Sequence, residues 1–150
     1  MPRAGAAFEM QLDHRVRVFV FDLTEEKPRY LLLRHRPRHE WPLGPVIGAV
    51  RVHEHMRDAV VRKVMDDTGL REPHHLIDLA EPARDLFGDM GLIEWPFAWQ
   101  AGLPATPAPE IVPGPKVGEF TWMGFEEAFR ALDAKRDREA LVRLQLRLAG

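Results

Sequence analysis

The segment from Gly48 to Leu70 reads GAVRVHEHMRDAVVRKVMDDTGL, and its spacing is the most informative in the chain. The apolar residues Met56, Val60 and Val64 recur every four residues, which gives a helix one buried stripe. The pattern therefore predicts a helix from about His55 to Thr68, and the glycine that follows it is a C-cap candidate.

Four charged residues of this predicted helix form two pairs that are one turn apart. Arg62 precedes Asp66 by four residues, and Lys63 precedes Asp67 by the same interval. We expect the four side chains to share the face opposite the apolar stripe. Paired carboxylates on one face suit Mg²⁺, which can bridge a diphosphate and activate an attacking water molecule. Taken alone, however, the four residues are more typical of a solvated helix face with weak ion pairs.

The spacing of the whole segment resembles the Nudix box. In that pattern glycine, five residues, glutamate and seven residues precede Arg-Glu-aliphatic-any-Glu-Glu-any-Gly-aliphatic. Asp66 and Asp67 keep the charge of the last two box glutamates, whereas Lys63 replaces the acid that follows the arginine. The resemblance extends from about Val16 to Leu148, and within the family it is most similar to the dATP and dihydroneopterin triphosphate pyrophosphohydrolases. The matching positions are Gly48, Glu54, Arg62, Val64, Gly69 and Leu70.

The resemblance implies an α/β (α+β) fold class, with the Nudix-type α/β/α sandwich and a mixed β-sheet. It also implies hydrolysis of a nucleoside diphosphate linked to another group, with Mg²⁺ or Mn²⁺ as the cofactor. On this basis the metal ligands would be Asp66, Asp67 and the carbonyl of Gly48. Glu54 and Arg62 would serve the catalytic site by a mutual contact that holds the loop before the helix.

The lysine in the box leaves three interpretations open. A protonated lysine cannot ligate Mg²⁺, and neighbouring aspartates favour its charged form. We therefore expect the ammonium group of Lys63 to bridge Asp66 and Asp67 and so to replace the metal ion in part. The leading interpretation is a Mg²⁺-dependent hydrolase that Lys63 weakens and whose acid lies elsewhere, with Glu119 the leading candidate and Glu110 the second. Alternatively, it is a regulatory domain that binds a nucleotide without turnover. The third interpretation is the solvated helix face.

Residues before the helix are candidate contacts to a nucleotide. Arg34 ends a predicted strand and opens the basic segment RHRPRHEW, and arginine is a good bidentate partner for phosphate. Trp41 could stack on a base or anchor the loop, and Lys63 is a third substrate-binding candidate. His53 and His55 could suggest a transition-metal site, but two histidines without a third ligand are more typical of an exposed loop.

The rest of the chain mixes strands with a few helices. Apolar patterns predict strands over 15–21, 29–35, 74–80, 93–101 and 119–123, a helix near 124–133, and a last helix that Asp137 could cap. Trp95, Phe97 and Trp99 would share one face of a strand and line the core. Between the predicted strands 93–101 and 119–123, residues Gly102–Gly118 hold five prolines and three glycines, which predicts a long loop or flap.

Length and composition limit the possible functions. A chain of 150 residues suits a single domain, 1–150. The net charge of -2 provides no global basic field, so we expect neither nucleic acid nor membrane as a partner. The chain has no cysteine, which excludes disulfides and thiolate metal sites. We expect a cytoplasmic protein whose partner is a small-molecule nucleotide or another diphosphate. Homodimers are common in the family that it resembles.

Overall fold

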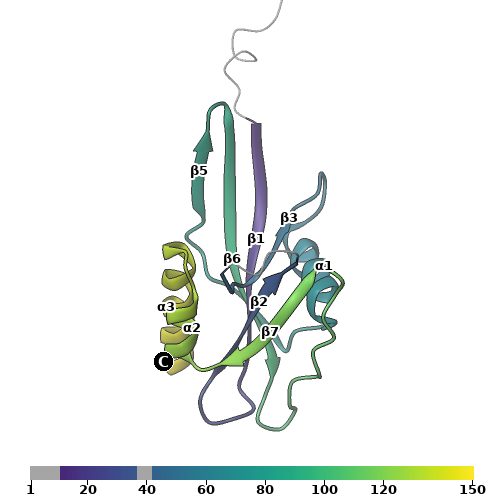
Figure 1. The fold of residues 1–150 in the computed structure, drawn as a ribbon, viewed down its shortest axis with the longest axis vertical. Coiled ribbons are helices and arrows are strands. Elements are labelled where there is room, and N and C mark those ends of the chain that lie inside the picture. Colours follow the sequence, from purple (N-terminus) through teal and green to yellow (C-terminus); the bar gives the residue numbers. More distant parts are fainter. Residues whose placement is uncertain (1–10, 37–41) are drawn as a thin grey trace, which may run out of the picture.

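A computed structural model of the chain describes residues 11–36 and 42–150. Its elements alternate along the sequence much as the apolar patterns predict (Figure 1). The strands of this part of the chain are β1 (Gln11–Asp22), β2 (Arg29–His35), β3 (Val46–Ala49), β4 (His75–Asp78), β5 (Ala83–Phe87), β6 (Met90–Gly102) and β7 (Val117–Met123), and its helices are α1 (Met56–Thr68), α2 (Phe125–Ala131) and α3 (Lys135–Ala149).

The strands form a single mixed sheet with the order β4-β6-β1-β2-β7. β3 pairs with β1, and β5 pairs with β6. The pairing of β1 with β6 is parallel, whereas the other pairings are antiparallel. A parallel pair needs a long crossover connection, and α1 lies in the segment that provides it.

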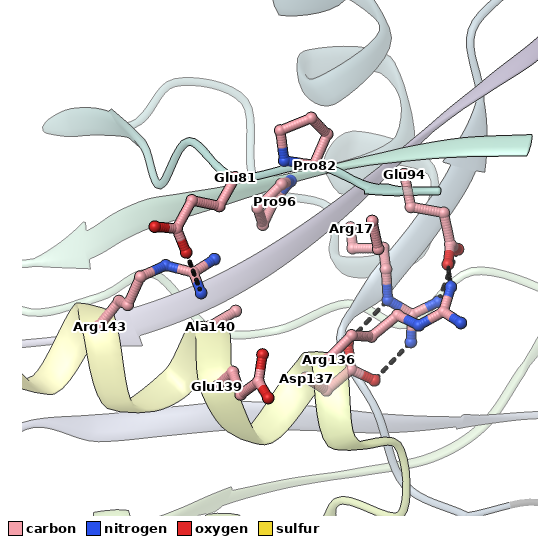
Figure 2. A pocket seen from close by; sticks show the side chains of 11 residues that line it. Arg17, Glu81, Pro82, Glu94, Pro96, Arg136, Asp137, Glu139, Ala140 and Arg143 are labelled. Atoms are coloured by element: carbon pink, nitrogen blue, oxygen red, sulfur yellow. Dashed lines mark hydrogen bonds and ion pairs between the residues drawn. The ribbon is translucent and has the colours of Figure 1, made fainter. Parts of the chain in front are cut away.

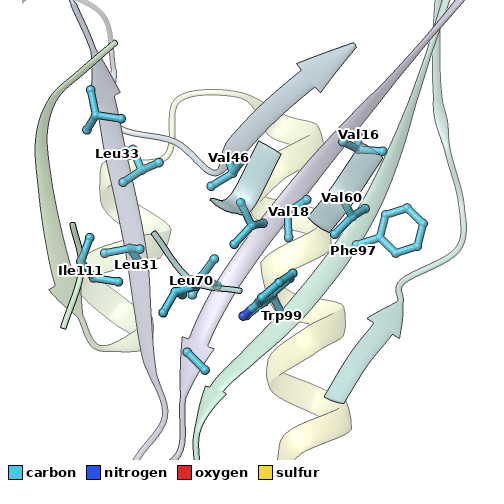
Figure 3. Close-up of a cluster of buried hydrophobic side chains, with 14 of the residues drawn as sticks. Val16, Val18, Leu31, Leu33, Val46, Val60, Leu70, Phe97, Trp99 and Ile111 are labelled. Carbon is cyan, nitrogen blue, oxygen red and sulfur yellow. The ribbon is translucent and has the colours of Figure 1, made fainter. Parts of the chain in front are cut away.

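Two apolar clusters lie on opposite faces of the sheet, because successive side chains of a strand point to opposite sides. Val18 of β1 and Trp99 of β6 pack with Val60 and Val64 of α1 in the first cluster (Figure 3). In the second cluster, Phe19 and its neighbours on the other face pack against α2 and α3. Figure 1 shows the sheet between α1 on one side and α2 with α3 on the other. The predicted α/β/α sandwich with a mixed sheet is confirmed.

Two of the differences from the sequence-based predictions concern β5 and the cap of α3. The strand β5 was not predicted, because ARDLF is mostly exposed or half-buried and shows no apolar alternation. It exists through its antiparallel pairing with β6 across a tight turn in which Gly88 has φ 63°. The N-cap of α3 is Ala134, so the prediction that Asp137 caps this helix was wrong. The carboxylate of Asp137 is instead buried against Arg17 of β1.

The other helix and strand predictions agree with the structure. α1 ends at Gly69, which adopts the left-handed conformation with φ 77° as a C-cap. The side chains of Trp95, Phe97 and Trp99 belong to one apolar cluster, as expected for core residues. No helix of the described residues has the length and apolar character to cross a membrane.

Candidate functional site

The candidate site lies where the end of β3 meets α1. Gly48 of β3 pairs with Val16 in the middle of β1, which fixes its position in the sheet. Val60 and Val64 of α1 are fully buried against the same cluster, and this packing decides which residues of the helix face the sheet. At the helix end, the N–H of Gly69 donates to the Met65 carbonyl at 2.9 Å.

Glu54 and Arg62 connect the loop before α1 to the helix. Arg62 donates from Nε and Nη2 to the two oxygens of Glu54 at 2.9 and 3.0 Å, and Nη2 also donates to the Ala49 carbonyl at 2.7 Å. The N–H of Arg51 donates to Glu54 at 2.9 Å. The hydrogen bond from Arg62, together with the one from the Arg51 backbone, lowers the pKa of Glu54 to about 2. The predicted Glu54–Arg62 contact is therefore present, and its geometry suits a structural brace.

The carboxylate of Asp67 is buried between two basic side chains. The Asp67 side chain is 3% exposed, and Lys63 Nζ lies 3.5 Å from its Oδ1. On the other side, Nε2 of His35 at the end of β2 lies 3.1 Å from its Oδ2. His35 was not singled out from the sequence, because its partner is 32 residues away and only the fold brings them together.

The four charged residues of α1 do not share one face, which corrects the sequence-based prediction. Consecutive side chains of a helix point about 100° apart. Lys63 and Asp67 turn toward the sheet, whereas Asp66 is exposed and lies beside Arg62. Hydrogen bonds from Arg62 to Glu54, and then the charges of Glu54 and Asp66, raise the pKa of Arg62. Among the described residues, the ion pair of Lys63 is with Asp67, so the predicted bridge to both aspartates is not formed.

The stem of Lys63 packs directly on Gly48. A β-carbon at residue 48 would lie 2.0 Å from Cγ of Lys63, 2.6 Å from Cδ and 2.9 Å from Cε. Only glycine leaves room for this approach, because no real β-carbon comes so close to another side chain. The lysine is therefore held along its stem by Gly48 and at its ammonium group by Asp67.

The remaining candidate residues lie apart from this ion pair. Arg34 and Glu119 are opposite each other on β2 and β7 and form an ion pair. Because side chains alternate along a strand, they point away from the face on which the neighbouring His35 meets Asp67. Glu119 as a replacement acid and Arg34 as a phosphate contact stay predictions. Trp41 lies outside the described residues.

The proline-rich segment packs against the end of α1. The N–H of Val112 donates to the Thr68 carbonyl at 2.9 Å, and the N–H of Gly114 donates to the Asp67 carbonyl at 3.2 Å. The side chain of Ile111 is buried in the cluster beneath α1. These contacts satisfy carbonyl groups at the end of α1 that have no partner within the helix. Glu110, His53 and His55 are exposed.

The side chains around Asp67 do not fit a divalent ion. Within residues 11–36 and 42–150, no group of three or more histidines and acids is arranged to hold a metal ion. Mg²⁺ binds carboxylate oxygens at about 2.0–2.1 Å, so an ion on Oδ1 would lie within about 6 Å of the Lys63 ammonium. At an effective dielectric constant of about 20, the repulsion between these charges is on the order of 5 kcal/mol. The lysine thus opposes the predicted metal site at Asp66, Asp67 and Gly48.

A separate cavity of about 230 Å³ lies between α3 and the sheet (Figure 2). Arg17 extends into it and donates to Asp137 of α3 at 2.7 Å and to Glu94 of β6 at 2.9 Å. Arg136 pairs with the same Glu94 and with Asp85. Because each of these charges has a partner of opposite sign, the cluster is best understood as an ion-pair network that joins α3 to the sheet.

Comparison with known proteins identifies the family to which the chain belongs. The model of the NUDIX domain matches residues 13–144. A NUDIX hydrolase from Listeria monocytogenes superposes with a TM-score of 0.75 at 18% identity, covering 91% of this chain and 94% of the other. The NUDIX domain of Shewanella oneidensis NrtR, solved with ADP ribose, gives 0.72 at 14% identity and 97% and 94% coverage. The dihydroneopterin triphosphate pyrophosphohydrolase of E. coli gives 0.72 at 18% identity and 89% and 95% coverage.

No curated protein matches the chain in sequence. The low identities of the structural matches establish the fold alone, since one fold supports many functions. The family model, in contrast, covers nearly the whole described sheet and all of α1. This chain belongs to the NUDIX domain family, and it is homologous to the Nudix pyrophosphohydrolases.

Proposed function

We propose that this chain is a Nudix domain that binds a nucleotide-type diphosphate and that does not turn it over by metal-assisted hydrolysis. The observation that carries the proposal is the ion pair of Lys63 with the buried Asp67, 3.5 Å apart. In the box pattern this position holds an acid, and here it holds a cation. Reversing a charge beside the carboxylates removes the feature on which metal-assisted attack depends.

The family and the residues around the site support the proposed ligand class. One structural relative was solved with ADP ribose, and another is described as a triphosphate pyrophosphohydrolase. In this chain Glu54 and Arg62 form a brace that ties the loop before α1 to the helix. Lys63 provides positive charge beside Asp67, and His35 at the end of β2 lies next to the same carboxylate.

A second candidate is the Nudix hydrolase itself, with Mg²⁺ or Mn²⁺ as cofactor and cleavage of a nucleoside diphosphate-linked substrate. The exposed carboxylate of Asp66 favours it, because this box acid is not committed to Lys63. Glu119, the acid predicted from the sequence, would then have to leave Arg34 and reach the face of the sheet on which Asp67 lies. Turnover distinguishes the two candidates.

The test is a paired assay of binding and turnover. Wild type and Lys63→Glu are incubated with nucleoside triphosphates, dinucleoside polyphosphates and ADP-ribose, with Mg²⁺ or Mn²⁺, and release of phosphate or pyrophosphate is measured. Calorimetry with the same ligands measures binding. The matched control is Lys135→Glu, because Lys135 is a lysine of α3 that is 91% exposed.

We expect wild type to bind at least one of these ligands and to release no product. We expect Lys63→Glu to gain metal-dependent turnover, which would show that the scaffold is otherwise competent. Turnover by wild type that stops when EDTA removes the metal would establish the hydrolase instead. If wild type neither binds nor cleaves any member of the panel, the proposed function is wrong.

A further inference from the structure

We infer that the ammonium group of Lys63 takes the position of a divalent ion at Asp67, so that the site carries a fixed cation and excludes the metal. Phosphate groups of a ligand would then meet this ammonium group directly. The ligand part of the inference rests on the proposed function, whereas the exclusion of the metal does not. It is carried by the arrangement of Lys63, Asp67, Gly48 and His35.

The carboxylate of Asp67 needs a positive partner where it lies. It belongs to the last turn of α1, next to Asp66, and that turn contains no basic residue. The C-terminal end of a helix carries partial negative charge, which disfavours acids there. In addition, Asp67 is almost completely removed from water, and a buried charge without a partner is strongly unfavourable. A cation at this point is therefore a structural requirement, and Lys63 provides it.

The lysine is held in place rather than free to swing away. Its stem lies against Gly48, and its side chain is only 17% exposed. Lys135 and Glu139 on α3 form a pair with the same spacing, 3.8 Å apart, with the two side chains 91% and 57% exposed. An exposed pair of that kind contributes little. The contrast indicates that Lys63 is a built-in part of the site and not a solvated surface charge.

The second oxygen of Asp67 is also engaged. His35 Nε2 lies 3.1 Å from Oδ2, within hydrogen-bond distance. Each oxygen of Asp67 thus faces a basic side chain, one from α1 and one from β2. A divalent ion on this carboxylate would have to displace the ammonium group that already neutralises it.

The exclusion of metal is tested with Mn²⁺ alone, in the absence of any nucleotide. The loss of the free Mn²⁺ signal in electron paramagnetic resonance measures binding to wild type, Lys63→Glu, Lys63→Met and the control Lys135→Glu. We expect Lys63→Glu to bind Mn²⁺ at least about tenfold more tightly than wild type, and Lys63→Met several-fold more tightly. The control should match wild type. Circular dichroism confirms that each variant is folded, and Lys63→Met keeps the test open if Lys63→Glu does not fold.

The fixed cation is tested with inorganic pyrophosphate and ADP-ribose by calorimetry in the presence of EDTA. We expect wild type to bind without metal and Lys63→Met to bind about tenfold to a hundredfold more weakly, as for the loss of one charge-assisted hydrogen bond. If pyrophosphate suffices, the phosphate groups carry the recognition. If only ADP-ribose binds, the nucleoside contributes as well.

Two results would overturn the inference. One is binding of Mn²⁺ by wild type as tight as by Lys63→Glu, or no gain in either variant of Lys63. The other is phosphate binding that requires Mg²⁺ or that is unchanged in Lys63→Met. If wild type binds no phosphate ligand under any condition, the proposed function fails with the ligand part of the inference, while the Mn²⁺ measurement still decides whether Lys63 keeps the metal out.

Discussion

Lys63 lies across Gly48 so closely that a β-carbon at residue 48 would stand 2.0 Å from its Cγ. Gly48 is therefore needed in this chain because its missing side chain leaves room for Lys63, and not because of its own backbone conformation. It gives the lysine a surface along which the stem can pack while the ammonium group reaches Asp67. Strand β3 and helix α1 are joined at this point by a contact between backbone and an aliphatic stem.

We predict that Gly48→Ala displaces the side chain of Lys63. The added methyl group overlaps three carbons of the lysine stem, and overpacking of this kind costs about 1–3 kcal/mol of unfolding free energy. Urea denaturation measures the stability, and calorimetry with pyrophosphate in EDTA measures the ligand affinity. We expect both the stability and the affinity to fall in Gly48→Ala. Gly44→Ala is the matched control, because a β-carbon there meets no atom within 4 Å. Equal stability of the two variants would contradict the prediction.

The brace of the loop should give the protein a specific pH dependence. Its hydrogen bonds lower the pKa of Glu54 from 4.5 to about 2 in the folded state. A carboxylate whose pKa folding lowers stabilises the folded state above its unfolded pKa, and this contribution is lost as the pH falls through the folded pKa. The stabilisation by Glu54 is therefore fully present above about pH 4.5 and disappears between about pH 4.5 and 2.

We predict that Glu54→Gln removes this part of the pH profile. Thermal unfolding from pH 7 to pH 2 should show wild type more stable at pH 7 and the difference from the variant shrinking below about pH 4.5. Because the pair is close to solvent, added salt should reduce the difference. Glu26→Gln, which changes an exposed glutamate outside the site, should leave the profile unchanged. A difference that stays constant with pH would show that the brace does not act through the charge of Glu54.

We predict that Arg17→Met is strongly destabilising. Arg17 joins Glu94 of the sheet to Asp137 of α3, and the two acidic side chains are 3% and 5% exposed. Removal of one member of a buried ion-pair network leaves uncompensated charge and costs about 3–5 kcal/mol. Urea denaturation followed by circular dichroism measures the loss. The control Arg147→Met changes an arginine whose contact with Asp78 is exposed, and it should stay within about 0.5 kcal/mol of wild type.

How far the sequence could predict this structure depended on the range of the interaction. The spacing of α1 and its C-cap at Gly69 are local and followed from the residues between Gly48 and Leu70, whereas the Glu54–Arg62 contact was implied by the resemblance to the Nudix box. The core position of Phe97 and Trp99 followed from strand alternation. These features depend on neighbours within a few turns, which a periodic pattern records.

The partners of the charged residues could not be predicted in the same way. Asp67 meets His35 from β2, and Asp137 meets Arg17 across 120 residues, so both contacts exist only after the sheet has formed. The four-residue spacing placed Asp67 with Lys63 on the face opposite the apolar stripe. In the structure Asp67 is buried, and Lys63 forms an ion pair with its carboxylate instead of lying on the solvated surface.

We predict that Gly114→Ala separates the proline-rich segment from α1. A β-carbon at residue 114 would lie 2.0 Å from the Asp66 carbonyl oxygen, which belongs to the rigid backbone of the helix and cannot move aside as a side chain can. The hydrogen bond from Gly114 N–H to the Asp67 carbonyl would be lost with it. We expect a loss of about 1–3 kcal/mol in unfolding free energy and faster proteolysis within residues 103–116. Gly124→Ala, at an open position, is the control. Because this segment adjoins the backbone that carries Asp67, weaker pyrophosphate binding in Gly114→Ala but not in the control would tie the segment to the site, and unchanged binding would confine its role to stability.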